Sequence, residues 1–332
     1  MITRRKALGA AGSVLTLSLA PGASRAQSSG QGQAFPDKPI KLIVPFTPGG
    51  VTDNIGRLMA ERMGRELGQP LVVDNRAGAN GRIGTDAVAK ATPDGYTLLV
   101  GSVGAFTIHP HMIKVPYDPV ADFIPISLIA TNDVVIVLNP ERPPKTAAEF
   151  IAWCKANSGK LQYGSSGIGS PTHMATELFR SRVGFDIVHV PYKGDSAAVA
   201  DVVAGVVDFS FSTISATIAL INAGKLRAIA VTGLTRSAIL PAVPTLDESG
   251  LKGFNAESWV GLFAPARTPD PVIKRIYDAV KVALADPEVR QKLVAGGNTI
   301  VGNDTAQYRA FLAAEWDKWG EVVRKGNIKL DE

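Results

Sequence analysis

Residues 40–67 decide the fold class, and they read IKLIVPFTPGGVTDNIGRLMAERMGREL. The first part, residues 40–46, is rich in the apolar and β-branched side chains that favour a strand. The last part carries apolar side chains at helical spacing, at Ile55, Leu58, Met59, Met63 and Leu67. Because the period of the apolar residues changes within one short stretch, we predict a β-strand that leads through a tight turn into an α-helix.

The same alternation of strand-like and helix-like runs continues along the chain. Most of the further strand candidates are separated by helix-like segments. This pattern predicts an α/β fold with mainly parallel sheets and helices on both faces. The chain has 332 residues, which is enough for two lobes of ordinary domain size. The further predicted strands are residues 71–74, 97–101, 134–138, 161–165, 187–191, 207–211 and 226–232.

The N-terminus has the layout of a bacterial secretory signal. Arg4, Arg5 and Lys6 precede an apolar run, and small residues near Ala26 fit a cleavage point. The apolar run is shorter than the roughly 18 to 20 residues that span a bilayer. We therefore expect residues 1–26 to be a signal peptide and the mature protein not to span a membrane. The arginine pair also permits the twin-arginine export route.

Charge and cysteine content restrict the partners and the compartment. The chain has 35 Lys and Arg residues against 30 Asp and Glu, and 31 of the basic ones remain without residues 1–26. The mature chain is almost neutral, which argues against a nucleic-acid partner. Cys154 is the single cysteine, so no internal disulfide can form and no cysteine near residue 26 can carry a lipid anchor. We expect a protein free in the periplasm, and a monomer by default.

The loop at residues 45–53 is the first candidate binding site. It joins a strand to a helix, and ligands of open parallel sheets bind at the carboxyl ends of strands. Gly49 and Gly50 let ligand atoms approach the main chain, and the free N–H groups of the first helical turn can hold a carboxylate. The alternative is a tight turn that binds no ligand.

A second loop of the same kind reads YGSSGIGSPTH at residues 163–173. It also joins a strand to a helix. Its small residues expose main-chain donors, and the hydroxyls of Ser165, Ser166, Ser170 and Thr172 can orient a carboxylate. Two such loops, far apart in the sequence, suit a ligand held from two sides.

Several stretches together resemble one known family. They include FPDKPI at residues 35–40, DNRAGANG at 74–81, PDGYTLL at 93–99 and VPYKG at 190–194, besides the two loops. In order along nearly the whole mature chain, they are similar to the substrate-binding component of tripartite tricarboxylate transporters, the Bug receptor family.

This resemblance implies a two-lobed periplasmic binding protein fold, type II-like, with the ligand cleft between the lobes. It implies capture of a small organic carboxylate for the membrane subunits of such a transporter, with no cofactor or metal. The family's glycine-containing loops hold the carboxylate by main-chain groups, hydroxyls and ordered water. Carried over to this sequence, the expected ligand-binding residues are Phe46, Thr47, Gly49, Gly50, Asp53, Ser165, Ser166, Gly167, Gly169, Ser170 and His173, with Ser102 and Tyr192 as weaker candidates.

Three of these positions, and Ser212 besides, allow two interpretations or depart from the family. Asp53 would stabilise the helix dipole, or would pair with a cationic group of the ligand. His173 could reach the ligand or serve a structural role. Thr47 stands where relatives often have proline, and Ser212 stands where many have an acidic residue, so the ligand cannot be transferred from relatives.

We expect the first lobe to contain residues 35–133 and 252–332, and the second lobe residues 134–251. The chain would cross between them near residues 131–135 and again near 246–258.

Two other functions remain open at this point. A periplasmic sensor would use the same fold and cleft, and would differ only in its partner. A hydrolase would use Ser165 or Ser166, but the sequence contains no G-x-S-x-G motif for an activated serine. We therefore expect a binding protein and not an enzyme.

Overall fold

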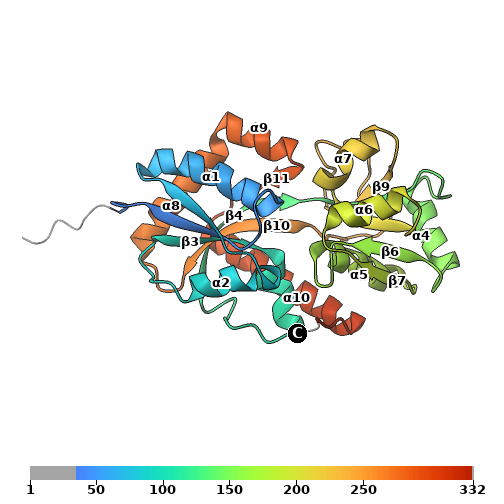
Figure 1. Ribbon diagram of the computed structural model, residues 1–332, viewed down its shortest axis with the longest axis horizontal. Coiled ribbons are helices and arrows are strands. Elements are labelled where there is room, and N and C mark those ends of the chain that lie inside the picture. Colours follow the sequence, from blue (N-terminus) through green and yellow to red (C-terminus); the bar gives the residue numbers. More distant parts are fainter. Residues whose placement is uncertain (1–34, 331–332) are drawn as a thin grey trace, which may run out of the picture. The chain divides into compact units, whose positions relative to one another are not determined.

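The computed structural model describes residues 35–330 of the chain. The predicted signal peptide, residues 1–26, lies outside the described residues. Within residues 35–330, the chain forms a six-stranded and a five-stranded sheet, and each sheet is covered by helices (Figure 1). We call the part built on the six-stranded sheet the first lobe and the part built on the five-stranded sheet the second lobe.

The sheet of the first lobe has the strand order β11-β4-β10-β3-β1-β2. Strand β1 is parallel to both β2 and β3, whereas β10 is antiparallel to β3 and β4, and β11 is antiparallel to β4. The carboxyl ends of β1, β2 and β3 therefore meet at one edge. The strands are β1 (Ile40–Val44), β2 (Leu71–Asn75), β3 (Thr97–Ser102), β4 (Phe123–Asn132), β10 (Ser258–Pro265) and β11 (Asn298–Ile300).

The sheet of the second lobe has the strand order β7-β6-β8-β5-β9. Strand β6 is parallel to β7 and β8, and β5 is antiparallel to β8 and β9. The carboxyl ends of β6, β7 and β8 thus reach the same edge of this sheet. The strands are β5 (Val134–Leu138), β6 (Gln162–Ser165), β7 (Val188–Pro191), β8 (Phe209–Thr213) and β9 (Arg227–Val231).

The prediction of an α/β fold is confirmed, but the prediction of mainly parallel sheets is wrong. Antiparallel pairs involve β4, β5 and β10. The reason is that β4 runs directly on into β5, with only Asp133 between them, and β10 brings the chain back. A strand that enters a sheet from the other lobe does not follow the strand-helix-strand crossover that makes neighbours parallel.

Helices cover both faces of each sheet because successive strand residues point to opposite sides. In the first lobe, α1 (Val51–Leu67), α8 (Asp270–Ala285) and α9 (Pro287–Ala295) cover one face and share one apolar cluster with the strands. Helices α2 (Arg82–Ala89) and α10 (Thr305–Gly326) cover the other. Three short helical segments complete this lobe: η1 (Ala79–Gly81), η2 (Gly104–Ile108) and α3 (His109–Met112).

In the second lobe, the two faces of β5 show this alternation directly. Val135 and Val137 pack with α6 (Asp195–Val203) and α7 (Ile214–Asn222). Ile136 packs on the opposite face with α4 (Ala147–Ala156) and α5 (Pro171–Val183). Of the helices in residues 35–330, none combines the length and the apolar composition needed to cross a membrane.

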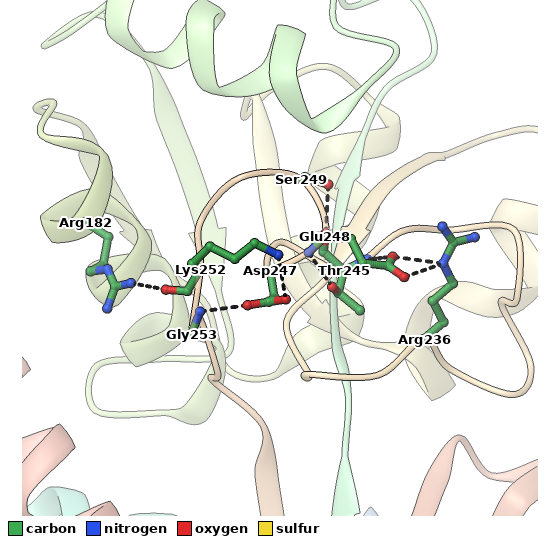
Figure 2. Close-up of polar contacts among 8 residues, drawn as sticks. All are labelled: Arg182, Arg236, Thr245, Asp247, Glu248, Ser249, Lys252 and Gly253. Carbon is green, nitrogen blue, oxygen red and sulfur yellow. Dashed lines mark hydrogen bonds and ion pairs between the residues drawn. The ribbon is translucent and has the colours of Figure 1, made fainter.

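The chain returns to the first lobe through a segment that is braced by its own polar contacts (Figure 2). In this segment, between β9 and β10, the Arg236 guanidinium pairs with the Glu248 carboxylate at 2.8 Å. Asp247 accepts a hydrogen bond from the main-chain N–H of Gly253 at 2.7 Å. Arg182 of α5 donates to the main-chain oxygen of Lys252 at 2.6 Å. The segment is therefore held against the second lobe.

Candidate functional site

A cleft of about 700 Å³ has walls from both lobes. The first lobe contributes the start of α1 and the end of α9, and the second lobe contributes the starts of α6 and α7. Helices α1, α6 and α7 follow β1, β7 and β8, so the cleft lies at the carboxyl ends of strands, where ligands of α/β sheets bind. Among the wall residues are Gly49, Gly50, Val51 and Asn54 from the first lobe and Asp195, Ser196, Thr213 and Ser215 from the second.

Another hollow, of about 330 Å³, lies within the first lobe. Its lining is mostly apolar and includes Phe106, Phe123, Leu312 and Trp316. It has neither a helix N-terminus nor wall residues from the second lobe. The cleft is therefore the better candidate for a polar ligand.

The first wall of the cleft is the N-terminus of α1. Its N-cap residue is Gly50, and no side chain caps the helix. Since the first N–H groups of an α-helix have no intrahelical acceptor, they are available to a ligand in the cleft. Gly49 has φ +88°, a conformation that side chains rarely adopt, so the turn into α1 requires glycine there.

Asp53 fixes the shape of this turn from behind. Its side chain is buried and accepts hydrogen bonds from the main-chain N–H of Gly49 (2.9 Å), from Arg57 (2.9 Å) and from Asn75 (2.7 Å). Burial raises the pKa of Asp53, but the hydrogen bonds from Arg57, Asn75 and Gly49 outweigh it and lower the pKa below its ordinary value. Asn75 also donates to the main-chain oxygen of Phe46 (3.0 Å), so both ends of the loop are tied to one network.

Three other predicted residues of the first lobe lie outside the wall of the cleft. Thr47 is exposed, and Phe46 is half-buried with its ring close to Gly81. Ser102 is buried at the end of β3.

The second predicted loop uses most of its donors internally. The main-chain N–H of Ser166 donates to the Thr172 hydroxyl at 3.0 Å, and that of Gly167 donates to the Ser165 hydroxyl at 3.1 Å. Ser170 caps α5 by accepting from the N–H of His173 at 3.2 Å. This loop is therefore a self-bonded turn, and its residues are not among those that line the cleft.

The imidazole of His173 lies inside the second lobe. Its Nδ1 accepts from the N–H of Gly169 at 3.1 Å, and its ring stacks on His189 with centroids 4.1 Å apart. Burial, reinforced by the charge of Arg180, lowers the pKa of His173 to about 4. The side chain is therefore neutral at pH 7.

Tyr192 and Ser212 are likewise bonded within the second lobe. The Tyr192 hydroxyl donates to the Asp201 carboxylate at 2.5 Å, and burial and this carboxylate raise the pKa of Tyr192 to about 12. Ser212 is fully buried, with its hydroxyl 2.6 Å from that of Ser210.

The second wall of the cleft contains residues that the sequence reasoning missed. Asp195 is the first residue of α6, and one of its oxygens, Oδ2, accepts from both the N–H (3.0 Å) and the hydroxyl (2.8 Å) of Thr213. Neither α6 nor α7 has a side-chain cap at its N-terminus. The sequence did contain a signal for these residues, since both helices come shortly after predicted strands. Parallel strands bring the turns that follow them to one edge of the sheet, where ligands bind.

Comparisons with known proteins show the family to which the chain belongs. The family model described as "Tripartite tricarboxylate transporter family receptor" matches residues 55–328. Protein BugT of Bordetella pertussis is 39% identical over 301 residues, which cover 89% of this chain and 91% of BugT.

Two solved structures share the fold over most of their length. One, described as a periplasmic transporter, has 43% identity and a TM-score of 0.78, and the match covers 90% of this chain and 100% of that one. The other, Rpa4515 of R. palustris with adipate, has 32% identity and a TM-score of 0.78, with 89% and 99% coverage. The chain belongs to the family of tripartite tricarboxylate transporter receptors.

Proposed function

We propose that this protein captures a small organic carboxylate in the cleft and presents it to the membrane subunits of a tripartite tricarboxylate transporter in the periplasm. One observation carries the proposal: α1 begins at the cleft wall, behind Gly49 and Gly50, and no side chain caps it. The partial positive charge of a helix N-terminus favours a carboxylate there. Family membership and the adipate in the related Rpa4515 structure support the same ligand class.

The proposed recognition uses neutral donors more than cations. Arg57 lines the cleft, but it is bonded to Asp53 and Asn75. Lys292 also lines the cleft and is paired with Glu288 at 2.6 Å. Main-chain N–H groups and the hydroxyl of Ser196 remain as the donors for a carboxylate.

In this proposal, the predicted residues of the second loop support the wall of the cleft from behind. Ser166, Gly167 and Gly169 shape the edge where β6, β7 and β8 end, and the Ser166 hydroxyl lies beside Asp195 in the wall. A ligand could bind them only if the loop exchanged its internal hydrogen bonds for new ones.

We also propose that the protein is not an enzyme. Ser165 Oγ lies 2.6 Å from His189 Nε2, which is the contact that a serine hydrolase uses. However, Ser165 is fully buried and is not among the residues that line the cleft, and its hydroxyl already accepts from the N–H of Gly167 at 3.1 Å. Burial and the neighbouring His173 lower the pKa of His189 to about 4, which makes it a weak base at neutral pH.

A substitution at Gly50 tests the proposed carboxylate site. Gly50 has φ −78°, and an added Cβ would come no closer than 3.9 Å to Thr47, so Gly50→Leu fits the backbone. The leucine side chain would enter the cleft and shield the N–H groups of α1. We expect calorimetry with straight-chain carboxylic acids, compared on the acid that wild type binds most tightly, to show an affinity lower by about tenfold or more, or about 1.4 kcal/mol.

Gly50→Ala is the matched control, because it restricts the same backbone position with far less volume. It should bind more tightly than Gly50→Leu, and both variants should melt close to the wild type. Equal affinity of Gly50→Leu and wild type would remove α1 from the site. Product formation from model esters of these acids would contradict the proposal that the protein only binds.

A further inference from the structure

The carboxylate of Asp195 is used unequally in the wall of the cleft. Oδ2 accepts two hydrogen bonds from Thr213. Oδ1 is buried and has no donor at full hydrogen-bond distance in the described part of the chain. Burial raises the pKa of Asp195, while the Thr213 donors and the Ser166 hydroxyl, which is itself 2.9 Å from the Thr172 hydroxyl, act in the opposite direction. A buried carboxylate oxygen that accepts no hydrogen bond is unfavourable. A ligand that donates a hydrogen bond to Oδ1 would remove this cost.

The cations of the opposite wall do not offer that partner without losing bonds of their own. Arg57 would have to leave Asp53 and Asn75. Lys292 would have to leave Glu288. A hydrogen-bond donor on the ligand would not have to give up an existing bond within the protein. Asp195 lines the same cleft as Gly49 and Gly50, so such a ligand can contact both walls.

We propose that Asp195 is the specificity-determining residue of the cleft and selects carboxylates that carry a second, hydrogen-bond-donating group. The ligand class is therefore a hydroxy acid or an amino acid. Its carboxylate binds at the N-terminus of α1 in the first lobe, and its hydroxyl or ammonium donates to Asp195 Oδ1 in the second. This inference rests on the proposed function, because it assigns the other end of the same ligand.

The assignment also predicts what the cleft rejects. A dicarboxylate would place its second negative charge against Asp195, and like charges in a partly desolvated site repel each other. An acid that ends in a methyl group would leave Oδ1 without a donor. Both should bind more weakly than an acid of the same length with a terminal donor.

A set of matched acids tests the proposal with the full-length mature protein. The probes are straight-chain carboxylates of four to six carbons whose far end is a methyl, hydroxyl, ammonium or second carboxylate group. For at least one chain length, calorimetry should show that the ammonium or hydroxyl compound binds at least about tenfold more tightly than the methyl compound, as a hydrogen bond to a charged group implies. The two donor series distinguish an amino acid from a hydroxy acid.

Asp195→Asn should change the order of these ligands. It removes the charge and keeps the shape, so the ammonium compound should lose about tenfold in affinity while the dicarboxylate gains. The methyl compound should change less than either. Because one ligand weakens while another strengthens, a folding defect cannot produce this result. Asp186→Asn is the matched control, since that side chain is 84% exposed in the same lobe.

The outcomes separate the two proposals. If no acid of the set binds, the proposed carboxylate function fails and the inference fails with it. If acids bind but the methyl compounds bind as tightly as the donor compounds, Asp195 has no role in selection. If Asp195→Asn weakens all ligands equally, Oδ1 serves a contact within the protein, such as Arg57 on closure, and the inference is overturned.

Discussion

Asp53 illustrates how a carboxylate can support an anion site without contacting the anion. It lies in the first turn of α1, where a negative charge stabilises the helix, and its acceptors are taken by Gly49, Arg57 and Asn75. The hydrogen bond to Gly49 holds the glycine turn open toward the cleft. On this geometry, Asp53 acts by positioning the main chain.

Asp53→Asn should therefore destabilise the protein in a pH-dependent way. The folded state lowers the pKa of Asp53 below 3.8, so its contribution is present above that pH and is lost as the pH falls through the lower, folded-state value. We expect urea unfolding at about pH 7 to show a loss of about 1 to 3 kcal/mol, as for hydrogen bonds to a buried charge. The difference from wild type should shrink below about pH 4. A constant difference across this range would show that the charge is not what Asp53 contributes.

At the residue scale, the sequence predicted part of the candidate site. The glycines of the first loop follow a clear strand and open a clear helix, and Gly49 and Gly50 lie in the cleft wall. Asp195 was missed because its turn has a single glycine, and its importance depends on Thr213, which is 18 residues away. Contacts between residues so far apart in the sequence depend on the order of strands in the sheet, and a local sequence pattern does not contain that order.

At the element scale, the two crossings bring a buried and a half-buried carboxylate together. Asp133 lies between β4 and β5, and Glu257 immediately precedes β10. Burial, followed by the charge of Glu257, raises the pKa of Asp133 to about 7. Burial also raises the pKa of Glu257. Both carboxyl groups lie beside Gly233. A Cβ atom built on that glycine would be 2.4 Å from Asp133 Oδ1 and 3.4 Å from the carboxyl carbon of Glu257.

This pair predicts that stability falls as the pH rises. Because the folded-state pKa of Asp133 exceeds 3.8, the folded protein holds a proton that the unfolded chain has released, between about pH 4 and 7. Asp133→Asn removes this titration. We expect the variant to exceed the wild type in unfolding free energy by about 1 to 3 kcal/mol at pH 8 to 9, and to lose that advantage near pH 5.

Asp186→Asn serves again as the exposed control and should leave the pH profile unchanged. If Asp133→Asn is less stable than wild type at every pH, then the Asp133 carboxylate makes contacts that outweigh its burial, and the expected sign is wrong.

The elements themselves were predicted unevenly. The parallel strands were recognised because each precedes a helix with a periodic apolar face, as in β1 and α1. Strands β4, β10 and β11 were not among the predicted strands, since no helix separates β4 from β5 or β9 from β10, and β11 has only three residues. Sequence patterns report local periodicity, whereas the antiparallel pairs here are set by the path of the chain between the lobes.

At the scale of the whole molecule, α10 joins the lobes a third time. The aromatic ring of Tyr308 packs against that of Trp259 in β10, with ring centroids 6.0 Å apart. Further along the helix, Trp319 and Val322 belong to the same buried cluster as Phe179 of α5. The proposed first lobe, residues 35–133 and 252–332, therefore contributes a helix that also packs on the proposed second lobe, residues 134–251. A rotation between the lobes has to pivot on this contact as well as on the two crossings.

Ligand binding should close the lobes around this three-part hinge. A ligand that contacts α1 on one side and α6 on the other favours the closed form by the contacts it makes only there. We expect a smaller radius by X-ray scattering when a bound acid is present. Paired labels at Arg65→Cys and Lys193→Cys, one in each lobe, should move closer together.

The native thiol does not interfere with this measurement. Cys154 is buried, and burial raises its pKa, so the reactive thiolate is scarce and the introduced cysteines take the labels. Trp319→Ala provides the mechanistic comparison. This substitution should loosen the packing of α10 on the second lobe and broaden the distribution of label distances in the free protein. The distribution in the bound protein should stay narrow, because the ligand then holds the two lobes together. Identical distances with and without ligand in both proteins would mean that the cleft binds without closing. A broad distribution in the bound Trp319→Ala protein would instead place the main constraint on closure in α10 and not in the ligand.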